Sequence, residues 1–259
     1  HLLLMLAGVK MFAVLVAVFY HESIFWVFLS SAAGTAIVGY SLVYKGRDAS
    51  DMKSRQLFLL TTLSWLSLCL VASIQIWIIV PDCSFTDAWF ETVSAITTTG
   101  STVLSGLETM PKGVLFWRAL LQWIGGIGII VMAIAILPAL KIGGMKLFKT
   151  ESSDISEKIL PRSSSLSTYI LLVYLAISTA AALSYAIGGM SWFDAITHAM
   201  TSAATGGFAN YDASFGHFND QPHLLWIASL FMMLSALPLV LLVGTLRGHK
   251  WILFRDPQV

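Results

Sequence analysis

Two short runs of threonine and glycine stand at matching places in the chain. The first Thr/Gly segment, residues 97–102, reads TTTGST, and the second Thr/Gly segment, residues 204–209, reads ATGGFA, 107 positions later. A cation gives up its hydration water only where oxygen atoms replace it, and rings of backbone carbonyls do this in ion filters. The repeat therefore predicts a filter in which backbone carbonyls and threonine hydroxyls bind an alkali cation.

Six residues of these segments are the candidate ion-binding residues: Thr98, Thr99, Gly100, Thr205, Gly206 and Gly207. Four of them are expected to bind the ion through backbone carbonyls: Thr98, Thr99, Thr205 and Gly206. Glycine accepts positive φ, which lets successive carbonyls turn toward one axis. A side chain at Gly100 or Gly207 is therefore expected to obstruct that turn.

Short apolar stretches at 85–97 and 192–204 lead into the two segments. Each is too short to cross a bilayer as a helix, which takes about 20 residues. We interpret them as re-entrant pore helices followed by extended chain. Such chain is tolerated at membrane depth only where protein buries it or water reaches it, which implies a water-filled pathway. A helix C-terminus aimed at that pathway adds about half a negative charge, which favours a cation.

An acidic residue stands near the start of each short stretch, Asp87 in the first and Asp194 in the second. Each carboxylate is suited to cap the N-terminus of its helix. Each is also suited to enrich cations near the mouth of the pathway, and the sequence leaves both interpretations open.

The composition sets these segments in a membrane. Of the 259 residues, 57% are hydrophobic and 11% are charged, against about 25% charged in soluble domains. Apolar runs long enough to span a bilayer lie near 2–20, 23–44, 57–80, 114–140, 168–188 and 223–246. The net charge of +1 makes nucleic acid an implausible partner. No Cys/His metal spacing and no serine with a paired base is visible, so neither an enzyme nor a bound cofactor is expected.

Charge distribution predicts the orientation of the spans. Twelve of the fifteen Lys and Arg residues fall in three loops, near 45–55, 141–162 and 247–255. The positive-inside rule makes these loops cytoplasmic, and six alternating spans then fit. We expect an all-α membrane protein with a two-helix hairpin at 1–55, a first span–pore helix–span repeat at 56–145 and a second at 146–259. The polar tract at 141–167 is either a solvated linker or a docking surface for a cytoplasmic partner.

Several single residues admit a structural and a functional interpretation. Lys10, inside the first span, is expected to snorkel to the interface, and Arg118, beside Trp117, to anchor the fourth span there. His198 either hydrogen-bonds a neighbour or responds to pH. Pro138 and Pro238 fit helix ends, kinks or hinges.

Four stretches together resemble the membrane subunit of bacterial Trk potassium-uptake systems: residues 94–103 (SAITTTGSTV), the pair Trp117 and Arg118, residues 122–128 (QWIGGIG) and residues 204–210 (ATGGFAN). The likeness covers nearly the whole chain, including the leading hairpin. It implies potassium uptake across the bacterial inner membrane, no covalent chemistry, and a fold of four span–pore helix–span units around one pathway.

The resemblance also implies a homodimer and a cytoplasmic nucleotide-binding regulatory subunit of the TrkA type. Gly100 and Gly207 match the filter glycines of the first two units, and no third or fourth unit follows in this sequence. We therefore expect the N-terminal portion of a longer chain, or else a protein in which two such chains combine. A membrane scaffold that does not transport, with Thr/Gly segments that serve packing only, is the alternative.

Overall fold

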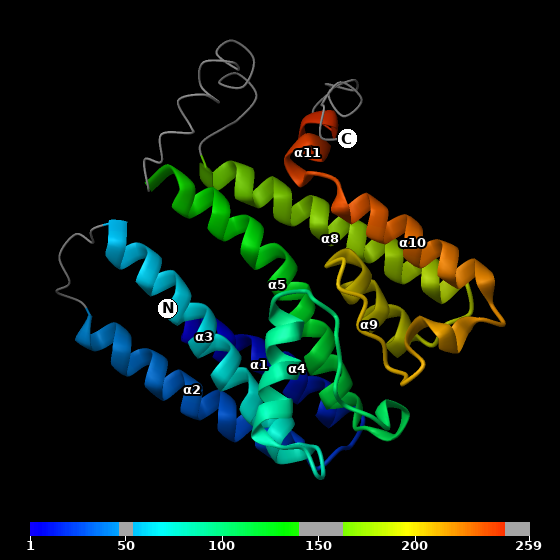
Figure 1. Cartoon of the computed structure of the whole chain (residues 1–259), viewed down its shortest axis with the longest axis horizontal. Coiled ribbons are helices and arrows are strands. Elements are labelled where there is room, and N and C mark those ends of the chain that lie inside the picture. The colour runs from blue at the N-terminus through cyan, green and yellow to red at the C-terminus, as the bar shows by residue number, and fades with distance from the viewer. Residues whose placement is uncertain (47–53, 140–162, 247–259) are drawn as a thin grey trace. The chain divides into compact units, whose positions relative to one another are not determined.

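The computed structural model describes residues 1–46, 54–139 and 163–246. Within these ranges every regular element is a helix (Figure 1), which confirms the predicted all-α class. Most basic residues of the three predicted cytoplasmic loops, and most of the polar tract at 141–167, lie outside the described residues.

The hairpin and the first repeat contain six helices in chain order: α1 (Leu2–Phe19), α2 (Phe25–Lys45), α3 (Ser54–Ile79), α4 (Phe85–Ile96), the short 3₁₀ helix η1 (Leu107–Thr109) and α5 (Lys112–Ala139). The second repeat contains α8 (Ser163–Ile187), α9 (Trp192–Ala203), the 3₁₀ helix η2 (Ser214–Phe218), α10 (Pro222–Ala236) and α11 (Leu239–Leu246). Both repeats thus have a long helix, a short helix and a further apolar helix in the same order.

Four stretches of the described helices are long and apolar enough to cross a membrane: Leu2–Phe19, Phe25–Lys45, Leu59–Ile79 and Thr168–Ile187. By contrast, α4 and α9 have 12 residues each, and 12 residues of α-helix rise only about 18 Å. The helices that precede the Thr/Gly segments are therefore too short to span about 30 Å of hydrocarbon.

The predicted span at 223–246 is divided between two helices, because the chain leaves α10 at Leu237. That residue has an extended backbone (φ −67°, ψ 146°), and α11 begins two residues later at Leu239. The next residue, Pro238, disfavours α-helical geometry in the residue before it and brings no N–H group. Pro138 lies within α5, one residue before the described range stops at Ala139. The helix-end and kink interpretation is confirmed for Pro238 and stays a prediction for Pro138.

The chain forms two compact units, and each is described by itself. The first unit comprises His1–Gln122 and Phe208–His217, and in it α1 packs on α2 and α3 packs on α4. The second comprises Trp123–Gly207 and the residues from Phe218 onward, and in it α8 packs on α9, α10 and α11. Residues 208–217, directly after Gly207, therefore belong to the unit that holds the first Thr/Gly segment.

Lys10 does not snorkel to an interface. Its side chain is fully buried, and Nζ donates to Ser31 Oγ at 2.7 Å and Thr35 Oγ1 at 2.8 Å, both on α2. The carbonyl of Val71 on α3 accepts a third bond at 3.3 Å. With its amide turned to suit its neighbours, Gln75 places Oε1 2.9 Å from the same ammonium. Neutral oxygens from two neighbouring helices therefore replace the water that snorkelling would have supplied.

Candidate functional site

Each short helix begins with a capping serine followed three residues later by an aspartate. Ser84 Oγ accepts the N–H of Asp87 at 3.1 Å, and Asp87 Oδ2 accepts the N–H of Ser84 at 3.1 Å, which is a complete capping box. In the second repeat, Ser191 Oγ accepts the N–H of Asp194 at 3.1 Å and donates to Asp194 Oδ2 at 2.7 Å. The structure thus shows Asp87 in the capping role, whereas the Asp194 carboxylate accepts a bond from the hydroxyl of the capping Ser191.

Both short helices also end in the same way. The N–H of Thr98 donates to Ala95 O at 3.0 Å and that of Thr99 to Ser94 O at 2.9 Å. In the second repeat the N–H groups of Thr205 and Gly206 donate to Ser202 O and Thr201 O, at 3.0 Å each. These are the two bonds of the Schellman motif, which turns a chain sharply out of a helix. They recur at the same offset as the sequence repeat.

The turn places a threonine in the left-handed region in each repeat. Thr98 and Thr205 both have φ 56°, and the glycines two residues later have φ 77° (Gly100) and φ 76° (Gly207). Gly100 and Gly207 therefore have the positive φ that the sequence predicts. A β-branched residue at positive φ is a genuine outlier that costs roughly 1–3 kcal/mol, and such strain gathers at functional sites. Two equivalent outliers at one repeat offset point to a conformation that serves a purpose.

This conformation leaves carbonyl oxygens without protein partners. Within the described residues, no N–H or O–H group donates to the carbonyl of any of the six candidate residues. The side chains of Thr99 and Thr205 are exposed, and Thr97 Oγ1 lies 2.8 Å from Thr99 Oγ1. Thr98, Thr99 and Gly100 belong to the first unit, and Thr205, Gly206 and Gly207 to the second. Each unit thus presents one short run of oxygen atoms suited to a cation.

A buried ion pair between α4 and α5 is hydrogen-bonded to the end of the first Thr/Gly segment. Arg118 Nε donates to Glu91 Oε1 at 2.7 Å, and the two side chains are 1% and 0% exposed. Glu91 also accepts from Thr102 Oγ1 at 2.9 Å and from the N–H of Val103 at 3.2 Å. In addition, Ser94 Oγ donates to Ser101 O at 2.6 Å. The extended chain that follows Gly100 is therefore fastened to α4 by the side chains of Glu91 and Ser94.

The same arginine holds the end of the second Thr/Gly segment. Arg118 Nη1 donates to Ala209 O at 3.1 Å, and its guanidinium carbon lies 4.4 Å from the centre of the Phe208 ring. The N–H of Phe208 donates to Gln122 Oε1 at 3.1 Å. The expectation that Arg118 anchors the span at the interface is wrong, because Arg118 and Trp117 are both buried. The sequence does contain a signal for the buried ion pair: an acidic residue, Glu91, and a basic residue, Arg118, stand in two largely apolar stretches.

Two acids outside the spans make a second fastening in the first unit. Asp212 Oδ2 accepts the N–H of Gly106 at 2.7 Å, and Oδ1 accepts that of Leu107 at 2.9 Å. In return, Glu108 Oε1 accepts the N–H of Asp212 at 3.0 Å. The backbone N–H groups of Leu107 and then Gly106 lower the pKa of Asp212. We call Asp212, Glu108 and these two N–H groups the outer clasp.

In the second repeat, residues of α8 and η2 contact the short helix. Tyr185 OH lies 2.7 Å from Ser202 Oγ, and His198 Nδ1 lies 2.8 Å from Asp194 O. The His198 ring also meets the Phe218 ring edge to face, with centroids 5.5 Å apart. The structure thus shows the hydrogen-bonded interpretation of His198, and its response to pH stays a prediction.

Fold and site together define the class. The chain is a multi-pass helical membrane protein with a leading hairpin and two repeats of the span–pore helix–span kind found in cation channels. It belongs to the TrkH family: the family model described as a cation transport protein matches residues 25–253.

Similar proteins agree with this placement. The chain is 52% identical over 231 residues to the Trk system potassium uptake protein TrkI of Halomonas elongata, covering 89% of this chain and 47% of that protein. It is 36% identical over 262 residues to the Trk system potassium uptake protein TrkH of Escherichia coli K12, covering 99% and 54%. The crystal structure of the potassium transporter TrkH from Vibrio parahaemolyticus superposes with a TM-score of 0.86 at 35% identity, covering 99% and 53%. The chain thus spans about half the length of these relatives.

Proposed function

We propose that this chain forms part of the pore-forming subunit of a potassium-uptake system in the bacterial inner membrane. Two similar proteins are named potassium uptake proteins, and one solved relative is named a potassium transporter. The observation that carries the proposal is the pair of equivalent turns at Thr98 and Thr205, each followed by a glycine at positive φ.

The chemistry of the Thr/Gly segments suits potassium. Carbonyls of Thr98, Thr99, Thr205 and Gly206, with Gly100 and Gly207 completing the turns, would replace hydration water around the ion. The C-termini of α4 and α9 lead into the segments and add partial negative charge there. No carboxylate is required at the ion, which leaves Glu91 free to pair with Arg118. Two units of four do not surround an ion, so in this proposal the remaining ligands come from further units, either in a longer chain or in a second copy.

The proposed partners follow from the family. A homodimer in the membrane and a cytoplasmic nucleotide-binding subunit of the TrkA type are part of the proposal. The alternative, a scaffold that does not transport, makes the Thr/Gly segments packing devices only. Reconstitution of the full-length protein and measurement of potassium flux separates the two functions.

The test of the ion-binding residues uses the full-length protein in a cell that lacks its own potassium uptake. Gly100→Ser places a side chain at φ 77°, so we expect uptake or K⁺/Na⁺ preference to fall sharply while the protein still reaches the membrane. Unchanged uptake with unchanged preference would overturn the assignment of the Thr/Gly segments as a filter.

A further inference from the structure

One buried glutamine of α5, Gln122, holds a peptide of the second Thr/Gly segment. Its side chain is fully buried, and Oε1 accepts the N–H of Phe208 at 3.1 Å. Phe208 comes directly after Gly207, the last of the candidate ion-binding residues. In a trans peptide, the N–H of one residue and the C=O of the residue before it lie in one plane and point in opposite directions. The glutamine therefore fixes the direction of the Gly207 carbonyl, which points away from Oε1.

The two peptides before this one are held by the end of α9. The N–H groups of Gly206 and Gly207 both donate to Thr201 O, at 3.0 and 3.2 Å. By the same peptide geometry, these bonds direct the two preceding carbonyls away from the helix end. The next peptide continues from Gly207, and its N–H donates to Gln122 on α5. Gln122 thus extends the series of held peptides by one.

The first Thr/Gly segment has no equivalent of this side-chain bond among the described residues. The N–H groups of Thr99 and Gly100 both donate to Ser94 O, at 2.9 and 3.4 Å. The N–H of Ser101, which corresponds to that of Phe208, has no acceptor in the part of the chain that the structure describes. The third peptide is therefore held through its N–H group in the second segment only.

The peptide after Gly207 needs a restraint because glycine leaves it free to rotate. Gly207 has φ 76°, and glycine populates positive and negative φ about equally readily. Rotation of this peptide would reverse the Gly207 carbonyl. Phe208 is buried, and a buried N–H group without an acceptor is costly. Gln122 removes that cost in the orientation that the structure shows, and so favours this orientation over the reversed one.

Gln122 lies on a face of α5 that contacts the second segment within each unit. In the first unit, Arg118, four residues earlier, donates to Ala209 O at 3.1 Å. In the second unit, a Cβ atom added at Gly126, four residues later, would lie 3.2 Å from Ala204 Cα. Residues four apart lie on the same face of a helix. Contacts on both sides of Gln122 along α5 therefore keep its side chain close to the segment.

Packing alone does not account for an amide at this position. Gln122 Nε2 is buried, and no group within the described residues accepts a bond from it. A buried donor without a partner lowers stability, and methionine, which is also unbranched and flexible, would fill the space without one. What glutamine adds over methionine is the acceptor Oε1, which binds the N–H of Phe208.

We propose that Gln122 is a positioning residue that sets the preference for potassium over sodium, because it holds the Gly207 carbonyl in one direction. The inference rests on the proposed function, in which carbonyls replace the hydration shell of the ion. Oxygen atoms held in place favour one ion size, whereas a carbonyl that turns leaves the smaller sodium ion less disfavoured.

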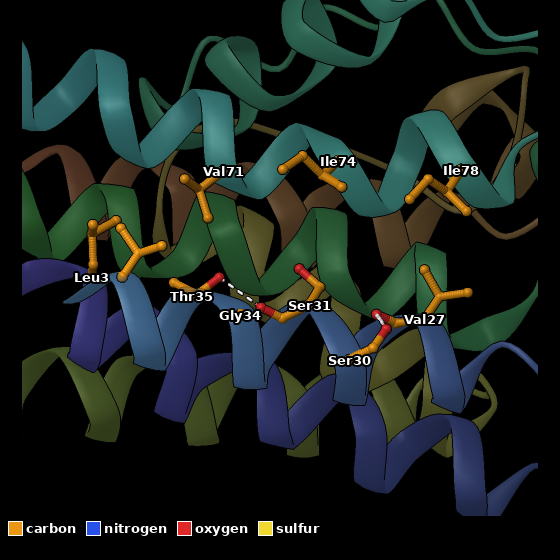
Figure 2. A pocket seen from close by; sticks show the side chains of 10 residues that line it. Leu3, Val27, Ser30, Ser31, Gly34, Thr35, Val71, Ile74 and Ile78 are labelled. Atoms are coloured by element: carbon orange, nitrogen blue, oxygen red, sulfur yellow. Dashed lines mark hydrogen bonds between the residues drawn. The ribbon is translucent and has the colours of Figure 1, made fainter. Parts of the chain in front are cut away.

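The test uses the full-length protein in liposomes, and both K⁺ and Na⁺ flux and thermal unfolding are measured for each variant. Gln122→Met removes the acceptor, and because it also removes the unpartnered Nε2, we expect it to fold. The control is Thr35→Val, at a residue that lines a groove between α2 and α3 (Figure 2) and accepts a bond from Lys10 at 2.8 Å. Both variants lose a buried hydrogen bond in the first unit, but only Gln122→Met loses one to a Thr/Gly segment.

We expect Gln122→Met to lower the K⁺/Na⁺ flux ratio by roughly threefold to tenfold, the equivalent of about one hydrogen bond, while potassium still passes. Thr35→Val should keep the wild-type ratio although it lowers the unfolding temperature. A wild-type ratio in Gln122→Met, or an equal fall of the ratio in Thr35→Val, would overturn the inference.

A second variant tests the bond from its other side. Replacing Phe208 by the matching α-hydroxy acid turns its amide into an ester, which removes the N–H donor and keeps both side chains. The ester also weakens the Gly207 carbonyl as a ligand, in wild type and in Gln122→Met alike. The part of the effect that comes from the lost bond should appear in wild type only. An equal fall of the flux ratio in the two backgrounds would contradict a role for Gln122.

Failure of this inference is distinct from failure of the proposed function. A wild-type protein that carries no potassium would overturn both. If Gly207→Ala lowers the flux ratio and Gln122→Met does not, the filter assignment stands and only the role of Gln122 is wrong.

Discussion

Glu91 and Arg118 lie 2.7 Å apart with almost no exposed surface, and together they contact the chain just after the candidate ion-binding residues of both Thr/Gly segments. Glu91 accepts from Thr102 and Val103, while Arg118 donates to Ala209. A buried ion pair contributes little net stability compared with a well-packed apolar pair. Its value here is positional, because one pair fixes two stretches of backbone that continue from the candidate ion-binding residues.

Removing one member of this pair should be costly. Glu91→Gln leaves the Arg118 guanidinium buried without its counter-charge, and we expect a loss of about 3–5 kcal/mol of unfolding free energy. Thermal unfolding of the full-length protein in detergent measures it. The double variant Glu91→Gln/Arg118→Met should recover much of the loss, since no charge then remains unpaired. A double variant that is less stable than Glu91→Gln would contradict the positional interpretation.

Lys10 and Thr35 should be energetically coupled. Thr35→Val keeps the shape of the side chain but removes one of the oxygens around the ammonium, and we expect it to cost about 1–3 kcal/mol. In a Lys10→Met background most of that cost should vanish, because no ammonium remains to be satisfied. Equal costs of Thr35→Val in both backgrounds would show that the hydroxyl does not solvate Lys10.

The outer clasp should respond to acid in one direction. Its backbone N–H donors lower the pKa of Asp212, so the folded state favours the carboxylate. The Asp212 carboxylate stabilises the folded state fully at pH values above the ordinary aspartate pKa of about 3.9. This stabilisation is lost as the pH falls through the lowered pKa of Asp212 in the folded protein. Wild type should therefore unfold at a higher temperature than Asp212→Asn between pH 7 and 5, and the gap should close below about pH 4.

The control for the clasp is Asp220→Asn, at an exposed residue beyond η2. It should unfold close to wild type throughout the range. A gap between wild type and Asp212→Asn that widens on acidification would mean that the sign of the linkage is wrong.

The left-handed threonines should trade stability for function. Asparagine tolerates positive φ better than a β-branched residue, so Thr205→Asn should stabilise the full-length protein by about 1 kcal/mol while lowering potassium uptake. Thr205→Val keeps the β-branch and its strain but removes the hydroxyl, so it should show no gain in stability. If Thr205→Asn and Thr205→Val are equally stable, relief of backbone strain at Thr205 does not explain the change in stability.

The repeat made the broad architecture predictable from sequence. The offset between Gly100 and Gly207, together with the length of the preceding apolar stretches, predicted the two short helices and the positive φ of both glycines. Both are local properties, set by residues that are neighbours in the chain. Pro238 likewise predicted a helix end or kink, and the structure shows a full break between α10 and α11.

Contacts between distant residues were not predictable in the same way. Arg118 reaches Glu91 and Ala209, and Asp212 reaches Gly106, across 27, 91 and 106 positions respectively. Hydropathy places a charge near the end of a span but does not say whether water or a partner satisfies it. Lys10 shows the same limit, because the oxygens that bury it come from α2 and α3.

The most direct test of the central claim compares two glycines at positive φ in the full-length protein, reconstituted in liposomes for K⁺ and Na⁺ flux. Gly207 has φ +76° with an added Cβ 3.2 Å from Met232 Cε, and Gly189, outside both Thr/Gly segments, has φ +103° with an added Cβ 3.8 Å from Gln221 Oε1. Alanine strains the backbone at both sites. We predict that Gly207→Ala loses potassium flux or its preference over sodium, whereas Gly189→Ala keeps both. Equal behaviour of the two variants would contradict a filter at the Thr/Gly segments.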